Sequence, residues 1–414
     1  MAHPLKLFSF KRVILPVIIG LGVAVFLIAK DFSEPIISEV ESGMGKYYWV
    51  DANNDRAKDI SELHIANQEN PGNIAIDYQK DILKQMIKNW TWVSTFFLLI
   101  ALFFAIMRDF MYMLRLRHLS DKQLSWKQSF QVIMIWEFGS AITPSIVGGS
   151  AVAFFIVSLE GIGVARSTSI VMITALLDEL FYIIIAPIVI LLVGVNRAFV
   201  DNFDFTMFGY DFGIISVFLL GYGFMCLLTI IILMAIFIYP RSFQRFLYYL
   251  SQRKIFKKKK TDLQKIGDDV IVSSKEFKGK GFWFWLKAYL ITISSWISRF
   301  LVVNFIILAF SSYGDQLLIF ARQLVMWIIL LISPTPGSSG VAEFAFPIFF
   351  KEFIPLGLGS TLSVLWRLFT YYPYIILGLI VLPIWTRRVV KRQRLKKIQE
   401  NQDKEKLIQD QEDQ

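Results

Sequence analysis

Six charged side chains interrupt apolar stretches of this sequence, and they are the first place to look for chemistry. They are Asp178, Glu179, Arg299, Arg322, Glu343 and Arg367. A charge at the centre of a bilayer costs about 2.5–3.5 kcal/mol on insertion scales, so such residues usually face one another or a wet cavity. Two interpretations stay open. Either the charges form a structural ion-pair lock, for example Glu179 or Glu343 with Arg367, or they line a cavity. In a cavity, an arginine would meet a lipid phosphate, and the carboxylates would meet a cationic headgroup or carry protons.

The composition places these charges in a membrane protein. The chain has 414 residues, of which 55% are hydrophobic and 18% charged, and its mean hydropathy is +0.53. Apolar runs of 18 or more residues recur, which indicates a polytopic helical membrane protein. The net charge of +10 does not indicate nucleic-acid binding, because the basic residues lie beside apolar segments as the positive-inside rule expects. With a single cysteine, Cys226, disulfides and cysteine metal sites are excluded. We expect no cofactor, no metal and no catalytic residue.

Apolar segments divide the chain into predicted units. The predicted full spans are residues 13–29, 90–107, 166–193, 213–238, 281–310 and 360–385. Residues 1–29 form the first, uncleaved transmembrane span, residues 30–89 an acid-rich extracytoplasmic insert, and residues 90–390 the main transmembrane domain. The insert reads as a solvated loop with short helices, for instance at 78–88. Residues 391–414 form a cytoplasmic polar tail, either a frayed helix or disordered.

Two further apolar segments, 129–158 and 317–350, are broken by "SAITPSIVGGSA" and "LLISPTPGSSGVAEF". Proline removes a backbone donor and clashes with the preceding turn, whereas glycine permits tight turning and close backbone approach. Irregular backbone at membrane depth survives only where protein buries it or water reaches it. We therefore expect each break to offer free N–H groups at a helix N-terminus, which suit an anion such as a phosphate. Packing between helices also explains glycines at such positions. The candidate binding residues here are Thr143, Pro144, Gly148, Gly149, Thr335, Pro336, Gly337 and Gly340.

Charge parity predicts how the broken segments lie. Residues 239–287 carry thirteen Lys or Arg against four acidic residues. If both broken segments cross the membrane fully while the N-terminus faces inward, this basic stretch faces outward, which breaks the positive-inside rule. If each segment instead enters and returns on one side, both termini and the basic stretch are cytoplasmic. Each arm has about 14 residues, or about 20 Å of helix, too short for a core of about 30 Å. The sequence thus predicts an all-α integral membrane protein in the cell membrane, with six full spans plus two re-entrant helical hairpins.

The two hairpins also resemble each other. "TPSIVGG" begins at Thr143 and "TPGSSGVAE" at Thr335, and each is followed by a span that opens with Ser-Thr. In those spans Glu179 aligns with Arg367. Since the hairpins enter from opposite sides, the halves form an inverted repeat, as in many transporters with broken helices. Chance recurrence of Thr-Pro and Gly in apolar sequence is the alternative.

"TPSIVGG" with the "LLDEL" span, and "PTPGSSGVAEF" with "LWRLFTYYPYIILGLI", resemble the transmembrane domain of lysylphosphatidylglycerol synthases, over about residues 90–390. That family includes stand-alone flippase-like proteins, and the resemblance implies a lipid-translocating module. The family's second motif falls on Thr335, Pro336, Gly337, Gly340 and Glu343, and its next arginine on Arg367. The first motif departs from the family. This chain has Ser150 where the family often has an acid, and Ala153 where it often has an arginine. The pair Asp178–Glu179 stands where the family often has a glutamate–arginine pair. No soluble synthase domain follows residue 390, so we expect no aminoacyl transfer.

The sequence thus favours translocation or binding of a polar-headed phospholipid or polyprenyl-linked lipid. The substrate-binding candidates include Asp178, Glu179, Glu343 and Arg367. The expected partners are membrane lipids, anionic or phosphate-bearing, and a homo-oligomer or a separate lipid-modifying enzyme stays open. The alternatives are an integral membrane enzyme acting on a lipid headgroup and a non-catalytic scaffold that recruits a partner through the insert.

Overall fold

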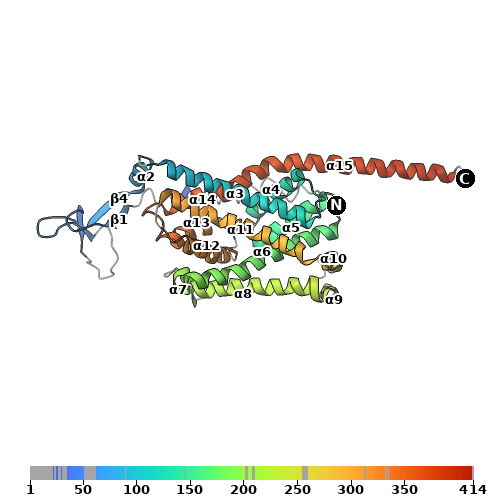
Figure 1. Cartoon of the computed structure of the whole chain (residues 1–414), viewed down its shortest axis with the longest axis horizontal. Helices are drawn as coiled ribbons and strands as arrows, with labels where there is room; N and C mark the ends of the chain where they lie inside the picture. Colours follow the sequence, from blue (N-terminus) through green and yellow to red (C-terminus); the bar gives the residue numbers. More distant parts are fainter. Residues whose placement is uncertain are drawn as a thin grey trace.

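The structure is a computed structural model, and it is mostly helical (Figure 1). It describes residues 22, 25–26, 29, 35–50, 62–88, 90–143, 145–200, 204–207, 210–253, 260–311, 314–331, 333 and 335–412. The predicted first span, 13–29, lies almost entirely outside these residues.

Five helices of the described chain are long and apolar enough to cross a membrane. They are α3 (Trp92–Leu119), α6 (Val164–Val193), α8 (Ile214–Leu233) continued by the π-helix η3 (Met234–Ile238), α11 (Phe282–Phe310), and the combined stretch Gly359–Leu395 of α14 (Gly359–Thr370) and α15 (Tyr372–Glu412). They confirm a multi-pass helical membrane protein and match five of the predicted spans. The match is not complete, because α3 runs beyond the predicted end at residue 107 and carries Arg108 and Arg115 into the bundle, where both are buried.

The first broken segment forms two helices, α4 (Trp126–Ile142) and α5 (Ser145–Leu159). A capping box starts α4: the Ser125 hydroxyl accepts from the Gln128 N–H, and the Gln128 side chain accepts from the Ser125 N–H. Small residues then let the two helices touch. A Cβ on Gly149 would lie 2.2 Å from the Ser140 hydroxyl, and one on Gly139 would lie 2.6 Å from Val152. Gly149 therefore serves close helix approach and not the turn itself.

The second broken segment forms α12 (Gln316–Leu331) and α13 (Val341–Phe350), with non-helical backbone between them. Gly337 and Gly340 adopt left-handed φ values of 55° and 85°, which L side chains rarely adopt. A Cβ on Gly337 would also lie 2.5 Å from the Tyr371 ring. Glycine is thus required at residue 337 both for the turn and for the close approach.

Each broken segment begins and ends at the same end of α6. At the N-terminal end of α6, Arg166 pairs with Asp121 at 2.6 Å, and the Gln128 amide donates to Glu160 at 2.8 Å. Asp121 precedes α4 and Glu160 follows α5, so this segment enters and returns there. In Figure 1, α4 and α5 lie in the half of the bundle that also holds α10 (Lys260–Lys278).

The α12–α13 segment begins and ends at the other end of α6. There, α6 is followed by the short helix α7 (Val195–Ala198), whose Arg197 pairs with Asp315 at 3.0 Å. Arg322 donates to the Arg197 carbonyl at 3.1 Å and to Glu352 at 2.9 Å. Figure 1 shows α12 and α13 in the half of the bundle that lies towards the small β-sheet. The two broken segments thus begin and end at opposite ends of α6.

Two apolar cores follow the same division. One core joins the C-terminal half of α6 to α8, α11, α12, α13 and α14, around side chains such as Phe346, Phe349 and Phe350. The other joins the N-terminal half of α6 to α3, α4, α5 and α15, around Ile135 and Ile156. Both cores share α6, so this helix is the common support of the two broken segments.

The polar segments hold more structure than the sequence predicts. In the basic stretch 239–287, α9 (Pro240–Ser251) and α10 pack against each other, and α10 contacts α6 through Ser273 and Ser169. Of the two alternatives for the tail, a frayed helix or disorder, the structure has a helix through Glu412 as the end of α15. Between α7 and α8, strands β5 (Asp204–Met207) and β6 (Tyr210–Gly213) form a hairpin.

The insert contains a sheet, so its interpretation as a solvated loop is wrong. Four antiparallel strands occur in the order β1-β4-β2-β3, and their bounds are β1 (Pro35–Glu39), β2 (Tyr47–Trp49), β3 (Leu63–Ile65) and β4 (Ile74–Tyr78). Ile74 in the "IAIDY" strand is fully buried, which gives the sheet an apolar anchor. The expected short helix is confirmed as α2 (Gln79–Lys88).

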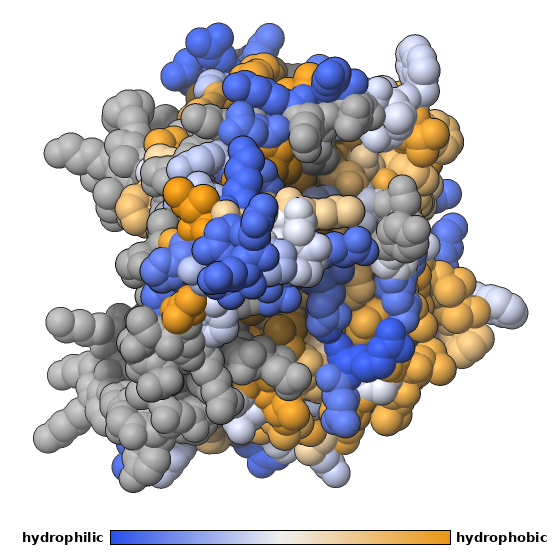
Figure 2. Space-filling model, turned by 90° about the vertical axis from the view of Figure 1, so that its left-hand side faces the viewer, coloured by the Kyte–Doolittle hydropathy of each residue, from blue (hydrophilic) through white to orange (hydrophobic). Residues whose placement is uncertain are grey.

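Polarity differs between the ends and the flanks of the bundle. Figure 2, seen from the sheet end, shows hydrophilic residues across the centre of this face and hydrophobic residues along its right-hand and lower flank. Several apolar side chains of the long helices are strongly exposed, among them Leu191, Leu192 and Trp92. This pattern suits a bundle that has apolar sides in lipid and polar ends in water.

Candidate functional site

A cavity of about 550 Å³ lies where the two broken segments meet. Both breaks contribute to its wall, together with α6, α8, α11, α14 and α15. Seven of the predicted site residues line it: Thr143, Gly149, Asp178, Glu179, Thr335, Gly337 and Arg367. Residues almost two hundred positions apart in sequence therefore share one space, as the hairpin model expects.

The other predicted residues lie elsewhere. Pro144 falls outside the described residues, and Gly148 lies within α5. Pro336 and Gly340 belong to the second break, and Glu343 belongs to the first turn of α13, but these three do not line the cavity.

Glu343 and Arg367 form a buried ion pair behind the cavity wall. The Arg367 Nε donates to Glu343 Oε1 at 2.9 Å, and the Glu343 side chain is 0% exposed. The other carboxylate oxygen accepts from the Gly340 N–H at 2.7 Å. The free N–H expected at this helix N-terminus is thus used by the chain's own carboxylate. Arg367 also donates to the Gly337 carbonyl at 3.1 Å, so the pair fixes the break.

Tyr371 connects the two broken segments. It lies at the junction of α14 and α15, and its hydroxyl donates to the carbonyl of Ala141 at 3.1 Å, next to the first break. The same hydroxyl accepts from Ser339 in the second break at 3.0 Å. A single side chain therefore holds both tips in register.

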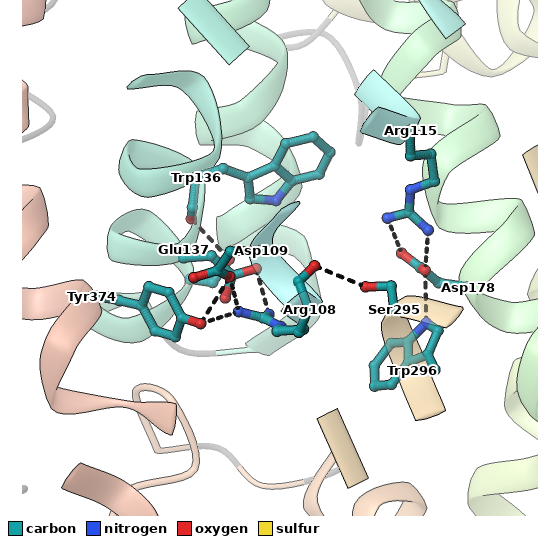
Figure 3. A network of polar contacts seen from close by, with 10 residues as sticks. Arg108, Asp109, Arg115, Trp136, Glu137, Asp178, Ser295, Trp296 and Tyr374 are labelled. Atoms are coloured by element: carbon teal, nitrogen blue, oxygen red, sulfur yellow. Dashed lines mark hydrogen bonds and ion pairs between the residues drawn. The ribbon is translucent and has the colours of Figure 1, made fainter. Parts of the chain in front are cut away.

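Asp178 is paired, and its partner is Arg115. The Arg115 guanidinium donates to both carboxylate oxygens, with Nη2 3.1 Å from Oδ2, and the Trp296 indole N–H donates to Oδ1 at 2.8 Å (Figure 3). Arg115 also donates to the Thr292 hydroxyl at 3.2 Å. This pair ties α3, α6 and α11 together at the cavity wall.

Glu179 has a different environment from its neighbour. Its carboxylate accepts from the Thr229 hydroxyl on α8 at 2.7 Å, and among the described residues it has no ion pair. The lock considered from sequence therefore forms between Glu343 and Arg367, whereas Glu179 keeps a carboxylate at the cavity surface without a cation beside it.

A second polar network was missed by sequence reasoning. Arg108 donates to Glu137 at 2.7 Å and to Asp109 at 2.9 Å, and it also contacts the Tyr374 hydroxyl (Figure 3). Tyr374 in turn donates to Asp109 at 2.9 Å. Because the predicted span ends at residue 107, Arg108 and Arg115 were not expected inside the bundle. Their spacing of seven residues, which places both on one helix face, was the available signal.

Arg299 lines the cavity on an aromatic surface. Its guanidinium carbon lies 4.0 Å from the ring centroid of Trp327 and 5.3 Å from that of Trp296. Arg322, by contrast, is not a cavity residue. It lies at the α7 end, where Arg197, Phe349 and Glu352 accept its hydrogen bonds.

Glu160 forms a polar lock outside the spans, in the turn between α5 and α6. Arg388 donates to it at 3.0 Å and Arg392 at 2.9 Å, while the Trp385 indole donates at 2.7 Å. Burial acts to raise the pKa of the Glu160 carboxyl, but the hydrogen bonds from the two arginines outweigh burial and lower that pKa below its ordinary value. The middle part of α15 is thereby held to the turn that follows the first broken segment.

The chemistry that this cavity supports is recognition of a polar group. It offers guanidinium, carboxylate, hydroxyl and aromatic surfaces, all held by neighbouring contacts. Within the described part of the chain, no group of three or more His, Cys, Asp or Glu residues is placed to hold a metal ion. The wall at α8 is apolar and faces outward, since Leu220 is 60% and Phe224 53% exposed. The cavity therefore has an exposed apolar rim on α8 and a mixed interior, in which charged and hydroxyl groups lie among apolar and aromatic side chains.

Comparison with known sequences agrees with this architecture. A relative from Archaeoglobus fulgidus, described as "UPF0104 membrane protein", is 27% identical over 315 residues, which cover 73% of this chain and 89% of the relative. No solved structure matches the chain. Residues 80–378 match the family described as "Lysylphosphatidylglycerol synthase TM region", a range that holds both broken segments and the whole cavity. The chain belongs to the lysylphosphatidylglycerol synthase transmembrane-region family.

Proposed function

We propose that this protein binds the polar headgroup of a membrane lipid in the cavity and moves that lipid between leaflets. The observation that carries the proposal is that the breaks of both helical segments open into one charged cavity with an exposed apolar rim on α8. Non-helical backbone at membrane depth is tolerated where it lines a water-filled cavity, and transporters use such sites at their centre.

The size of the cavity supports a headgroup as the occupant. Ligand pockets span about 300–1,000 Å³, and a space of about 550 Å³ holds a phospholipid headgroup or a sugar-phosphate but not two acyl chains as well. The acyl or polyprenyl chain would then lie in the bilayer against Leu220 and Phe224. A phosphate-bearing lipid fits best, because guanidinium groups bind phosphate through paired N–H donors.

Movement, as opposed to static binding, is supported by the opposed broken segments. Each reaches the cavity from a different end of α6, so a shift of either one opens a path to one side. In this proposal the segments are re-entrant hairpins of an inverted repeat and residues 13–29 complete six spans. The basic α9–α10 region and both termini are cytoplasmic, and the acid-rich insert is extracytoplasmic. The proposal includes no aminoacyl transfer.

Reconstitution tests the proposal directly. The full chain is placed in liposomes made from a native lipid extract, and the rate of inter-leaflet movement is measured by chemical modification of the outer leaflet. We expect faster movement than in protein-free liposomes. A rate equal to that of empty liposomes for every lipid class in the extract would refute translocation.

The two alternatives give different outcomes in the same preparation. A membrane enzyme would produce a chemically altered headgroup, detected by mass spectrometry of the extracted lipids. A scaffold that recruits a partner through the insert would lose function on deletion of residues 35–85 and keep it in Arg367→Ala. Translocation predicts the reverse for these two variants. A second copy of the chain and a separate lipid-modifying enzyme stay proposals as protein partners.

A further inference from the structure

Within the part of the chain that the structure describes, the cavity holds one positive and one negative group that no protein charge neutralises. Its ionisable carboxylates and guanidiniums are Glu137, Asp178, Glu179, Arg299 and Arg367. Three of them have ion-pair partners: Glu137 pairs with Arg108, Asp178 with Arg115, and Arg367 with Glu343. Among the described residues, Arg299 and Glu179 have no oppositely charged partner. These two charges are therefore available to a ligand.

Arg299 is oriented without using its hydrogen-bond donors. Its guanidinium carbon lies 4.0 Å from the Trp327 ring centroid and 5.3 Å from that of Trp296. The Trp296 ring is fixed by its hydrogen bond to Asp178, which Arg115 holds in turn. No hydrogen bond from the Arg299 guanidinium to another described residue occurs. A guanidinium held by ring faces presents its N–H fork in its own plane, which is the geometry that binds two phosphate oxygens.

Tyr182 adds an independent donor at the same cavity. Its side chain is 2% exposed and lines the cavity, and its hydroxyl has no hydrogen-bond partner among the described residues. Its ring packs edge-on against Trp296, with centroids 4.9 Å apart, so it shares the aromatic wall on which Arg299 lies. A buried hydroxyl without a partner is costly, and a bound acceptor would remove that cost.

Glu179 lies three residues before Tyr182 on α6, so both side chains lie on one helix face. The Thr229 hydroxyl satisfies one acceptor position of the Glu179 carboxylate. A carboxylate has about four such positions, and the remaining ones suit the several N–H donors of an ammonium group.

We propose that the cavity recognises a zwitterionic headgroup, in which Arg299 and Tyr182 hold a phosphodiester and Glu179 holds an ammonium group. This inference rests on the proposed function and narrows its lipid class. A headgroup with phosphate alone would leave Glu179 uncompensated beside a new negative charge, and such a like-charge contact in a partly desolvated site opposes binding. A phosphate with an attached amine satisfies both protein charges at once.

Binding to the purified full chain in detergent tests the inference. The probes are dihexanoylphosphatidylethanolamine, dihexanoylphosphatidylglycerol and the chain-free compound glycerophosphoethanolamine, followed by calorimetry or by ligand-induced thermal stabilisation. We expect tighter binding of the ethanolamine lipid than of the glycerol lipid. If glycerophosphoethanolamine binds as tightly as the lipid, the site serves a free phosphate ester and not a lipid, and the inference is overturned.

Single substitutions test which side chain binds which part of the headgroup. We expect Arg299→Gln to weaken binding of the ethanolamine lipid by about tenfold or more, and Tyr182→Phe by about threefold to tenfold. Glu179→Gln should remove the preference for ethanolamine over glycerol while binding of the glycerol lipid persists. Arg241→Gln changes an exposed arginine on α9 and should bind as the unaltered protein does.

Three results would overturn the inference. They are Arg299→Gln with unchanged affinity, an unaltered protein that prefers the glycerol lipid, and Glu179→Gln with an unchanged preference. Since Tyr182→Phe keeps the ring, its effect reports the hydroxyl even if Arg299→Gln fails to fold. Translocation is measured separately: binding as expected without inter-leaflet movement would refute the proposed function and leave the headgroup site standing.

Discussion

Removal of the Glu343 charge is the most informative perturbation of the second break. Glu343 is fully buried and accepts hydrogen bonds from Arg367 at 2.9 and 3.4 Å and from the Gly340 N–H at 2.7 Å. In Glu343→Gln the side chain keeps its size but cannot neutralise Arg367. The guanidinium then retains the Gly337 carbonyl and the Tyr371 ring as its contacts.

The expected destabilisation follows from the burial of the pair. Removing one partner of a buried ion pair costs about 3–5 kcal/mol, because a buried charge is left without compensation. Removing both charges avoids that cost, so the double variant Glu343→Gln/Arg367→Gln should be no less stable than either single variant. Glu352→Gln is the matched control, because Glu352 also pairs with an arginine but is 62% exposed. Its loss should cost less than about 1 kcal/mol.

Thermal unfolding in one detergent at one scan rate compares the unaltered protein with four variants: Glu343→Gln, Arg367→Gln, the double variant and Glu352→Gln. We expect a large fall in the apparent melting temperature for each single variant of the pair and a small one for the control. Strictly additive losses in the double variant would refute the reasoning, since they would show that the two side chains stabilise the break independently.

Three further changes test other parts of the structure. Gly337→Ala should destabilise the protein by about 1–3 kcal/mol, because its Cβ meets Tyr371 in a left-handed backbone conformation, whereas Gly223→Ala has nothing within 4 Å and should be neutral in the same melting assay. Tyr371→Phe should cost about 1 kcal/mol in stability and should raise hydrogen exchange at both breaks, since the hydroxyl links them; exchange unchanged at both would contradict the link. Glu160→Gln should lower stability at pH 7 by about 1–3 kcal/mol. Because the folded-state pKa of Glu160 is lowered, this stabilisation is complete above the ordinary carboxyl pKa of about 4.3 and disappears as the pH falls through the folded-state pKa. The melting temperatures of the variant and the unaltered protein should therefore begin to converge as the pH falls below about 4.3. A difference independent of pH would contradict this.

The sequence was sufficient for the long apolar helices because their signal is local. Apolar runs predicted the spans later described as α3, α6, α8, α11 and α14–α15, and the Thr-Pro and Gly clusters predicted where α4–α5 and α12–α13 are interrupted. The predicted ends of helices were wrong where polar residues of the helix are buried. The predicted span ended before Arg108, because a sequence pattern does not show that Glu137 on α4 lies close enough to pair with Arg108.

The insert and the pairing of charges needed the fold. The strands of the sheet pair residues that are far apart in sequence, such as Pro35 with Tyr78, and acidic composition conceals their short alternation. In the site, the residue types were predicted but the partners were not. Glu343 and Arg367 were foreseen as one alternative, whereas Asp178 with Arg115 depends on how α3 packs beside α6.

Blocking the cavity from each break tests the central claim, that both broken segments line one lipid path. In a Cys226→Ser background, Thr143→Cys and Ser338→Cys place single thiols at the cavity wall, and Ser242→Cys places one on α9 outside it. Each protein is reconstituted, treated with a bulky water-soluble maleimide and assayed for inter-leaflet lipid movement. The account predicts that modification at residues 143 and 338 stops the movement and that modification at residue 242 does not. Lipid movement that continues unchanged after complete modification at residues 143 and 338 would contradict it.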